Sequence, residues 1–340
     1  MLPTMRKLAA LLSAFLVSAG CFGEVIYIPG WVSGKRLTED CKEIELLKTI
    51  YPGEPIKLMN WDAVVRWETA KANAEAFASE VERHLAEKSD AERAEVILIG
   101  HSLGGRIALL AAGRLATQGR KIRQFVLLGA AADCGADLSA LARASTGTNI
   151  SIFSRSDNIL KVLYGNYEKN FPLGFCGASD PPAERFAQYE LVRPEMNLEL
   201  PDSTPAILLS LNYEELSRVQ NHQAVFYIGE LQSVVAGKSA PWRPRFDYSG
   251  VKIDRGALSI PENWVVPPIF KMEILEEYAQ WSLRKQDISY RRENKDGEAK
   301  EHTVTVYFIV DHHGRIVLWN LWKYPLRRRF DNIKRQIRPL

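Results

Sequence analysis

The stretch VILIGHSLGG, residues 96–105, constrains the fold of this chain more than any other. Its first four residues, Val96–Ile99, predict a strand that is buried on both faces, and the residues after the turn have the pattern of a helix. Ser102 lies on that turn, with Gly100 and Gly104 on either side. Glycine at these positions removes side chains that would collide where the strand and the helix approach each other.

A serine on such a turn can act as a nucleophile, or it can simply cap the helix that follows. The helix N-terminus brings a positive dipole end and free amides to the place where an oxyanion would form. Because the motif lies between a strand and a helix, as a nucleophile elbow requires, we interpret Ser102 as a nucleophile. The adjacent His101 is expected to fill the turn, with its side chain pointing away from Ser102.

The first twenty residues have the pattern of a secretory signal, with Arg6 and Lys7 ahead of a short apolar run and a small-residue exit. The apolar run is too short for a membrane span. Cys21 follows Ser-Ala-Gly, which resembles the lipobox of bacterial lipoproteins, although Ser18 stands where leucine is usual. We expect residues 1–20 to be removed and the chain to be exported to a bacterial cell envelope or periplasm. Lipidation of Cys21 and ordinary cleavage beside it are the two alternatives.

The composition is that of an ordinary globular protein, with 46% hydrophobic and 25% charged residues and a net charge of +3. So small a net charge argues against nucleic acid as a partner. The last twenty residues are nevertheless basic, because they hold one acidic residue, Asp331, and seven basic ones. The basic residues are Lys323, Arg327, Arg328, Arg329, Lys334, Arg335 and Arg338. This pattern predicts either a solvated helix face or a helix that contacts an anionic membrane surface.

The four cysteines, Cys21, Cys41, Cys134 and Cys176, do not have the spacing of a metal site. If Cys21 is lipidated or removed, the other three allow at most one disulfide and leave one thiol over. The sequence does not choose the pair.

Short apolar strands alternate with helical patterns between about residues 24 and 235. The predicted strands are 25–29, 55–60, 95–100, 124–130, 149–154 and 205–211, and the predicted helices lie near 40–50, 68–89, 103–118, 137–145 and 183–193. Because parallel strands need crossover connections, this alternation predicts an α/β fold, a mostly parallel sheet with helices on both faces. Ligands of such sheets bind beyond the carboxyl ends of the strands.

The order of these elements and the GHSLGG turn resemble the α/β-hydrolase superfamily over about residues 25–235. The resemblance implies that an acid and then a histidine follow the nucleophile along the chain. It also implies two backbone N–H donors for the oxyanion, those of Leu103 and Trp31. The segment IPGWVSG resembles the oxyanion loop of the family, but Pro29 stands where many members have histidine.

Asp157 follows the predicted strand 149–154, which is where the family places its acid. Asp133, after the preceding strand, is the alternative acid, and Asp157 could instead cap the next segment. Of the six histidines, His222 alone lies in the loop after the last predicted strand, so it is the expected base. The others lie in a charged helix, in the elbow and in a later hairpin region, at His84, His101, His302, His312 and His313.

Trp31, Trp61 and Trp67 follow early strands or lie in the loops beyond them, so they are candidates for an apolar substrate pocket near Ser102. Plain core packing is the alternative for all three. A pocket of this kind would favour a substrate with an acyl or aryl part over a charged one.

The pattern changes after residue 235. Residues 236–270 are rich in proline and turn residues and predict a linker that wraps over the core, and residues 271–340 predict a small α+β unit. In that unit we expect a helix over 272–286, a hairpin of the runs 302–311 and 315–322, and a basic amphipathic helix over 325–337. Its turn carries Asp311, His312 and His313, for which a solvated turn is favoured over a metal site, because adjacent turn residues do not converge on one ion.

These features predict an exported serine hydrolase of the lipase or carboxylesterase type, acting through Ser102, His222 and Asp157 without a metal or an organic cofactor. Its substrate would be a small-molecule or lipid ester, and esters, thioesters and amides are not distinguished at this stage. The alternative is a binding or scaffolding protein, attached to the envelope, that keeps the fold without turnover. The membrane surface is a candidate partner, through a lipidated Cys21 or through the basic C-terminal helix.

Overall fold

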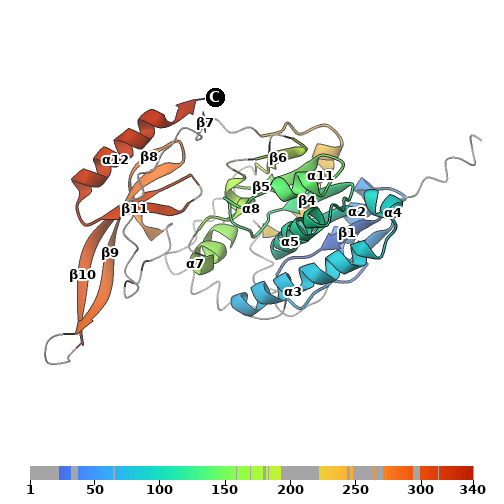
Figure 1. The fold of residues 1–340 in the computed structure, drawn as a ribbon, viewed down its shortest axis with the longest axis horizontal. Helices are drawn as coiled ribbons and strands as arrows, with labels where there is room; N and C mark the ends of the chain where they lie inside the picture. Colours follow the sequence, from blue (N-terminus) through green and yellow to red (C-terminus); the bar gives the residue numbers. More distant parts are fainter. Residues whose placement is uncertain are drawn as a thin grey trace, which may run out of the picture.

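The computed structural model describes most of the chain from residue 23 onward (Figure 1). The described ranges are 23–31, 37–63, 66–157, 159–168, 170–178, 181–182, 184–192, 222–242, 246–247, 264, 266, 271–293, 299–312 and 314–339. The expected signal segment 1–20, Cys21, the predicted strand 205–211 and His313 lie outside these ranges.

A six-stranded parallel sheet forms the centre of the molecule, with the order β2-β1-β3-β4-β5-β6. The strands are β1 (Val25–Ile28), β2 (Ile56–Leu58), β3 (Ile97–His101), β4 (Gln124–Leu128), β5 (Asn149–Phe153) and β6 (Phe186–Glu190). Every residue of β1, β3 and β5 is buried. The first five strands confirm the sequence prediction. Continuous apolar runs form the inner strands, which are covered on both faces, and β2 is a half-buried edge strand.

The last strand of this sheet corrects the sequence prediction, which placed a helix over 183–193. Residues 186–190 instead pair in parallel with β5. The buried side chain of Gln188 secures this strand, since it accepts a hydrogen bond from the backbone N–H of Ala178 (2.8 Å) and donates one to the carbonyl of Ala178 (3.0 Å). A run this short has too few residues for the spacing of its apolar side chains to distinguish a helix from a strand.

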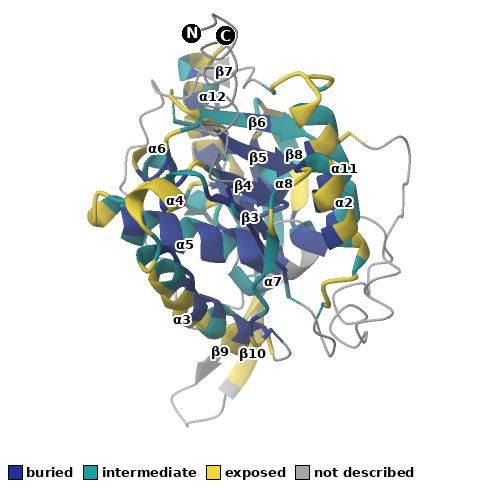
Figure 2. Ribbon diagram, turned by 90° about the vertical axis from the view of Figure 1, so that its right-hand side faces the viewer, coloured by how far each residue is buried: buried dark blue, intermediate teal, exposed yellow. Residues whose placement is uncertain are grey.

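Helices cover both faces of the sheet (Figure 2). On one face lie α3 (Trp67–Ala86), α5 (Leu103–Thr117) and α6 (Ser139–Arg143). On the other face lie α2 (Lys42–Ile50) and α11 (Ala224–Val235). Alternate residues of the strands point to the two helical layers, as Ile26 and Tyr27 of β1 do.

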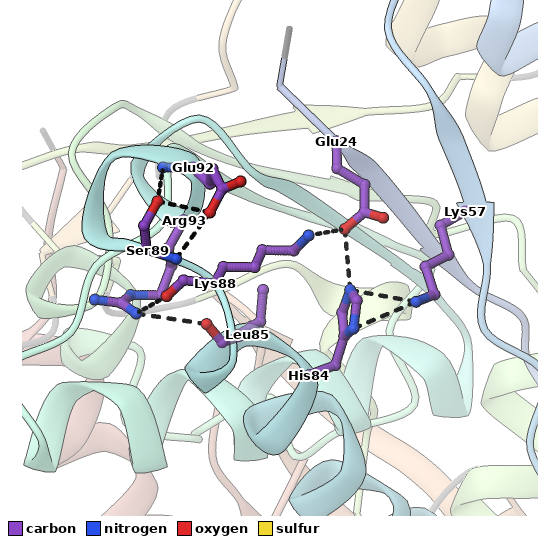
Figure 3. A network of polar contacts seen from close by, with 8 residues as sticks. All are labelled: Glu24, Lys57, His84, Leu85, Lys88, Ser89, Glu92 and Arg93. Carbon is purple, nitrogen blue, oxygen red and sulfur yellow. Dashed lines mark hydrogen bonds and ion pairs between the residues drawn. The ribbon is translucent and has the colours of Figure 1, made fainter. Parts of the chain in front are cut away.

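A polar network ties the start of β1 to the end of α3 (Figure 3). The carboxylate of Glu24 accepts hydrogen bonds from His84 Nε2 and Lys88 Nζ, both at 3.0 Å, and Lys57 of β2 lies 3.3 Å from His84 Nδ1. Burial alone would raise the pKa of Glu24, but the hydrogen bonds from His84 and Lys88 outweigh it and lower that pKa. The short helix α4 (Asp90–Ala94) follows, and Ser89 and Glu92 cap its N-terminus reciprocally.

The C-terminal part forms a separate antiparallel sheet with the order β11-β10-β9-β8. The strands are β8 (Glu273–Tyr278), β9 (Trp281–Glu293), β10 (Ala299–Val310) and β11 (Ile316–Asn320), and they are followed by α12 (Lys323–Gln336). The predicted hairpin and the predicted basic helix are thereby confirmed. A short ladder joins β7 (Phe246–Asp247) to β12 (Arg338–Pro339).

The helix expected over 272–286 is wrong, because these residues form the β8–β9 hairpin. Its turn consists of Ala279 and Gln280, with φ angles of 49° and 66°. Two left-handed residues suit the twist of a two-residue hairpin, but glycine and asparagine are the usual residues there. The turn therefore carries no recognisable signal in the sequence.

The two faces of the C-terminal sheet pack differently. Leu326, Phe330 and Ile333 of α12 cover one face. On the other face lies a cluster that includes Phe171, which belongs to the segment between β5 and β6. Phe171 meets the β10–β11 turn at Gly314, where an added Cβ would lie 2.2 Å from the Phe171 ring. The carboxylate of Asp311 closes the same turn by accepting the backbone N–H of Arg315 at 2.8 Å.

Within the described residues, no helix combines the length and the apolar character needed to cross a membrane.

Two glycines of α5 provide a matched test of the packing that fixes the position of this helix. An added Cβ at Gly104 would lie 2.2 Å from the carbonyl oxygen of Ile28, whereas one at Gly113 would have no atom within 4 Å. We expect Gly104→Ala to lower the free energy of unfolding by about 1–3 kcal/mol or more, because the backbone must move. Gly113→Ala should raise it by about 0.5–1 kcal/mol. Urea unfolding of both variants measures this difference, and equal effects would contradict the close approach.

Candidate active site

Ser102 lies between β3 and α5 in a strained backbone conformation, with φ 53° and ψ −120°. Residues other than glycine rarely adopt a positive φ, and strained residues of this kind cluster at active sites. Glycines surround Ser102 closely. A Cβ added to Gly100 would lie 2.3 Å from the Gly104 carbonyl oxygen. A Cβ on Gly30 would lie 2.6 Å from the Cβ of Ser102. The strand, turn and helix thus have the arrangement that the sequence pattern predicts.

Asp157 and His222 meet although 65 residues separate them. Asp157 is fully buried just beyond β5, and its Oδ2 lies 2.6 Å from His222 Nδ1. Because a carboxylate oxygen accepts hydrogen bonds, Nδ1 carries the proton, and Nε2 of the neutral ring is then an acceptor. Nε2 is buried and has no hydrogen-bond partner among the described residues. The histidine is therefore oriented from one side and available on the other.

His222 and Ser102 line the same cavity, so the structure brings together the three residues predicted as nucleophile, base and acid. Asp133, the alternative acid, is occupied elsewhere. One of its oxygens accepts the backbone N–H of Gly135 at 2.7 Å, and the other accepts a hydrogen bond from Asn170.

Tyr227 is a site residue that the sequence reasoning missed. Its hydroxyl donates a 2.6 Å hydrogen bond to the same Oδ2 of Asp157 that His222 contacts, and the side chain is completely buried. Gly129 makes room for the ring, because an added Cβ there would lie 2.8 Å from Tyr227 Cζ. A tyrosine within the apolar run AVFYIG reads as plain core, and nothing in the sequence relates it to Asp157.

The sequence analysis expected the side chain of His101 to point away from Ser102. This expectation is wrong. The ring of His101 lies 4.8 Å from the ring of His222, centroid to centroid, and it lines the same cavity as Ser102. Burial holds the pKa of His101 well below its ordinary value, and the neighbouring His222 lowers that pKa further. His101 is therefore a neutral, buried ring packed against the candidate base.

The segment expected to carry the oxyanion loop lies directly beside Ser102. Gly30 makes the close approach described above, and Trp31 borders the cavity. Trp61 was predicted to line the substrate pocket, but it is buried in the core, and its indole N–H donates to the Pro29 carbonyl at 2.8 Å. Its aromatic body made it a pocket candidate, whereas the structure gives it the role of holding the loop in place.

The cavity above Ser102 has a volume of about 370 Å³. Trp67 forms part of its wall, as predicted, with its ring edge-on to Trp31 at 5.9 Å and to Tyr164 at 6.0 Å. Aliphatic side chains complete much of the wall, namely Leu37, Ile159, Leu160 and Val225. The Trp67 indole N–H donates to Glu168 at 3.0 Å, which fixes the ring. The lining is mainly apolar, and among the residues that the structure describes its charged members are Lys42 and Glu43.

The segment after Asp157 borders the cavity at Ile159, Leu160 and Tyr164. It consists of the π-helix η1 (Leu160–Tyr164), α7 (Gly165–Glu168) and α8 (Leu173–Cys176). A disulfide between Cys134 and Cys176 joins α8 to the loop after β4, and Cys41 is a free thiol. The sequence allowed one disulfide without choosing the pair, and the structure identifies it.

The buried His101 gives the free energy of unfolding a definite pH dependence. The unfolded chain binds a proton on this residue below about pH 6.5, whereas the folded chain does not, so acidification favours unfolding. We expect His101 to lower the free energy of unfolding by about 1.4 kcal/mol for each pH unit below that value and to leave it unchanged above that value. Urea unfolding between pH 7.5 and 5.5 should give a shallower loss for His101→Phe than for the parent. Equal slopes would contradict the buried neutral ring.

Comparison with known proteins adds a match to one family model. Residues 57–162, which include Ser102 and Asp157, match the model described as lipase (class 3). A search of curated protein sequences found no match.

Several solved structures are similar to parts of the chain. An esterase of Pyrobaculum calidifontis is 18% identical over 39% of this chain and 58% of its own, with a TM-score of 0.28. A cell surface hydrolase of Lactobacillus plantarum is 9% identical over 64% of this chain and 91% of its own, with a TM-score of 0.35. A hydrolase of the alpha/beta superfamily from Xanthomonas campestris is 15% identical over 62% and 98%, with a TM-score of 0.31. The chain thus spans little more than half of the Pyrobaculum esterase.

The parallel strand order, the strained serine between β3 and α5, and the lipase match to residues 57–162 agree with one another. Together they identify the part of this chain around the six-stranded sheet as an α/β-hydrolase fold. A small antiparallel C-terminal extension follows it.

Proposed function

We propose that this protein is a serine hydrolase that cleaves carboxylic esters through an acyl-enzyme. One observation carries the proposal, namely the buried Asp157–His222 pair at 2.6 Å that shares a cavity with the strained Ser102. A scaffold without turnover has no need for a buried carboxylate behind a histidine whose second nitrogen lacks a partner among the described residues. The lipase match to residues 57–162 supports the same reaction class.

In the proposed reaction, Ser102 Oγ attacks the ester carbonyl carbon while its proton passes to His222 Nε2. Asp157 stabilises the imidazolium that results. The tetrahedral intermediate then releases the alcohol, which takes the proton from His222, and leaves the acyl group on Ser102. Water, deprotonated by His222, attacks the acyl-enzyme and releases the carboxylic acid. No metal or organic cofactor takes part in these steps.

The backbone N–H groups of Leu103 and Trp31 are the proposed donors to the oxyanion. Leu103 is the first residue of α5, whose N-terminal amides have no partner within the helix. Trp31 follows Gly30, which lies against Ser102. The hydrogen bond from Trp61 to the Pro29 carbonyl holds the backbone two residues before Trp31.

The substrate is proposed to have an uncharged acyl or aryl part. Trp31, Trp67 and Tyr164 supply the aromatic wall of the cavity, and burial of apolar substrate groups against them provides binding energy. Lipase and carboxylesterase activities differ mainly in the length of the acyl chain that such a cavity accepts.

Export is proposed for the same chain. A structural disulfide persists in oxidising compartments, and the Cys134–Cys176 bridge is consistent with the signal pattern of residues 1–20. Lipidation of Cys21 and ordinary cleavage beside it remain the two alternatives for the mature N-terminus.

Covalent labelling with a fluorophosphonate probe tests the proposed nucleophile and base. We expect the parent to be labelled, Ser102→Ala to give no labelling, and His222→Ala to be labelled more slowly by about 10²-fold or more, since the general base is lost. Ser79→Ala, on the exposed side of α3, is the control and should react like the parent. Labelling that survives Ser102→Ala would overturn the proposal. An unchanged rate in His222→Ala would retain the serine and reject the base.

Two valines of α11 test whether the cavity holds the acyl chain. Val225 lines the cavity, whereas Val235 is exposed at the other end of the same helix. We expect Val225→Trp to lower kcat/KM for p-nitrophenyl octanoate by about tenfold relative to p-nitrophenyl acetate, because the added ring occupies room for acyl methylenes. Val235→Trp should leave the ratio unchanged. If neither valine variant changes the ratio, the acyl chain binds elsewhere.

A further inference from the structure

Helix α12 forms the outermost layer of the C-terminal unit (Figure 1). Leu326, Phe330 and Ile333 pack on one face of the four-stranded sheet, and the opposite face of that sheet meets the rest of the molecule through Phe171. The outer side of α12 is therefore turned away from the six-stranded sheet and its cavity.

Large apolar side chains are exposed where α12 begins. Leu321, Trp322 and Tyr324 are 44%, 73% and 79% exposed. No other part of the described chain has three such residues within four positions. Tyr324 also lies on the outer face, because Leu326 and Phe330 define the inner one. Aromatic side chains this exposed are costly in water and typical of surfaces that bind something.

Basic side chains surround these aromatics. Arg328 and Arg335 continue the outer face, four and eleven residues after Tyr324, and Lys323 and Arg329 flank it. Lys323, Arg328 and Arg329 have no acidic partner among the residues that the structure describes.

The acidic groups near α12 are engaged with other cations. Glu276 binds Lys334 and lies 3.6 Å from Arg327, and Asp331 lies 2.7 Å from Lys334. Arg335 donates to the side-chain oxygen of Asn332 and to the backbone carbonyl of Asp331. The hydrogen bond from Lys334 lowers the pKa of the Asp331 carboxyl, and the nearby Arg327 and Arg335 lower that pKa further. Asp331 therefore offsets part of the charge of these cations, and the remaining basic side chains leave the outer face with a net positive charge.

We propose that this surface docks on an anionic lipid bilayer. We call it the α12 patch and define it by Leu321, Trp322, Lys323, Tyr324, Arg328, Arg329 and Arg335. Tryptophan and tyrosine favour the level of the lipid headgroups, where the ring is buried and its polar edge stays hydrated. Lysine and arginine beside them are attracted to anionic headgroups and can extend toward the phosphates.

The charge of the α12 patch favours a bilayer over a second copy of the chain. A symmetric dimer through this surface would bring two identical basic faces together, and like charges oppose that contact. An anionic lipid surface offers complementary charge and an interface for the aromatics at the same time. The proposal does not depend on the hydrolase reaction, because binding is measured without turnover.

The test is co-sedimentation of the full chain carrying Ser102→Ala with vesicles of phosphatidylcholine alone or mixed with phosphatidylglycerol. We expect tighter binding to the anionic vesicles, and we expect added salt to weaken it. Trp322→Ala with Tyr324→Ala should weaken binding to anionic vesicles by about tenfold or more. Arg328→Gln with Arg335→Gln should also weaken it by at least about tenfold, since each basic residue near an anionic surface contributes about fivefold.

Matched variants away from the α12 patch serve as controls. Lys121→Gln with Lys238→Gln removes two exposed charges from the other unit, and Val235→Ala removes an exposed apolar side chain there. Both should bind like the parent, and circular dichroism should show that all variants are folded.

Two outcomes would overturn the proposal. The first is equal binding of the parent and the α12 variants to anionic vesicles. The second is self-association in light scattering that the α12 variants abolish without any binding to vesicles, which would assign the surface to a second copy. Labelling of Ser102 by the fluorophosphonate probe is read separately in the parent, so failure of docking is distinguishable from failure of the proposed reaction.

Discussion

The fully buried carboxylate of Asp157 is the interaction on which the site depends. A buried carboxylate is unfavourable unless hydrogen bonds replace its lost water, and this one receives them from three directions. The backbone N–H of Leu160 donates to Oδ1 at 2.9 Å, and His222 and Tyr227 contact Oδ2. Because Tyr227 lies on α11 and His222 just before it, the same carboxylate positions that helix and the candidate base. The packing of α11 on the sheet and the position of the candidate base therefore depend on the same carboxylate.

The second constraint is steric, and it acts on the other half of the site. Ser102 is held at a positive φ between a strand and a helix that lie so close together that only glycine fits at Gly100 and Gly104. Gly104 lies against the carbonyl of Ile28, and Gly30 lies against Ser102 itself. The close approach at these glycines brings the serine, the helix N-terminus and the loop with Trp31 together. The Trp61 side chain adds one hydrogen bond, to the Pro29 carbonyl.

The sequence predicted those parts of the protein in which local pattern and spatial role coincide. The run Val96–Ile99 and the glycines around Ser102 specify the elbow, because burial and close approach leave few alternatives. Asp157 and His222 followed from the order that the resemblance implies, and the structure brings their side chains together. Their roles in catalysis stay predictions until the nucleophile and the base are tested.

Other features depend on contacts that no local pattern encodes. Tyr227 reads as core because its partner lies 70 residues away, and His101 was misjudged because the position of His222 beside it is tertiary information. The β8–β9 hairpin turns at Ala279 and Gln280, which bear no turn signature, so the segment resembled a helix.

The contact between Phe171 and Gly314 has a consequence for how this chain could change over time. Gly314 has a φ of 75° and its backbone lies against an aromatic ring, so glycine is the residue that satisfies both conditions. Phe171 in turn directly precedes the segment that the Cys134–Cys176 bridge anchors. The C-terminal unit therefore contacts the rest of the molecule through a close-packed interface. Exchanging it for another unit would require residues on both sides of that interface to change together.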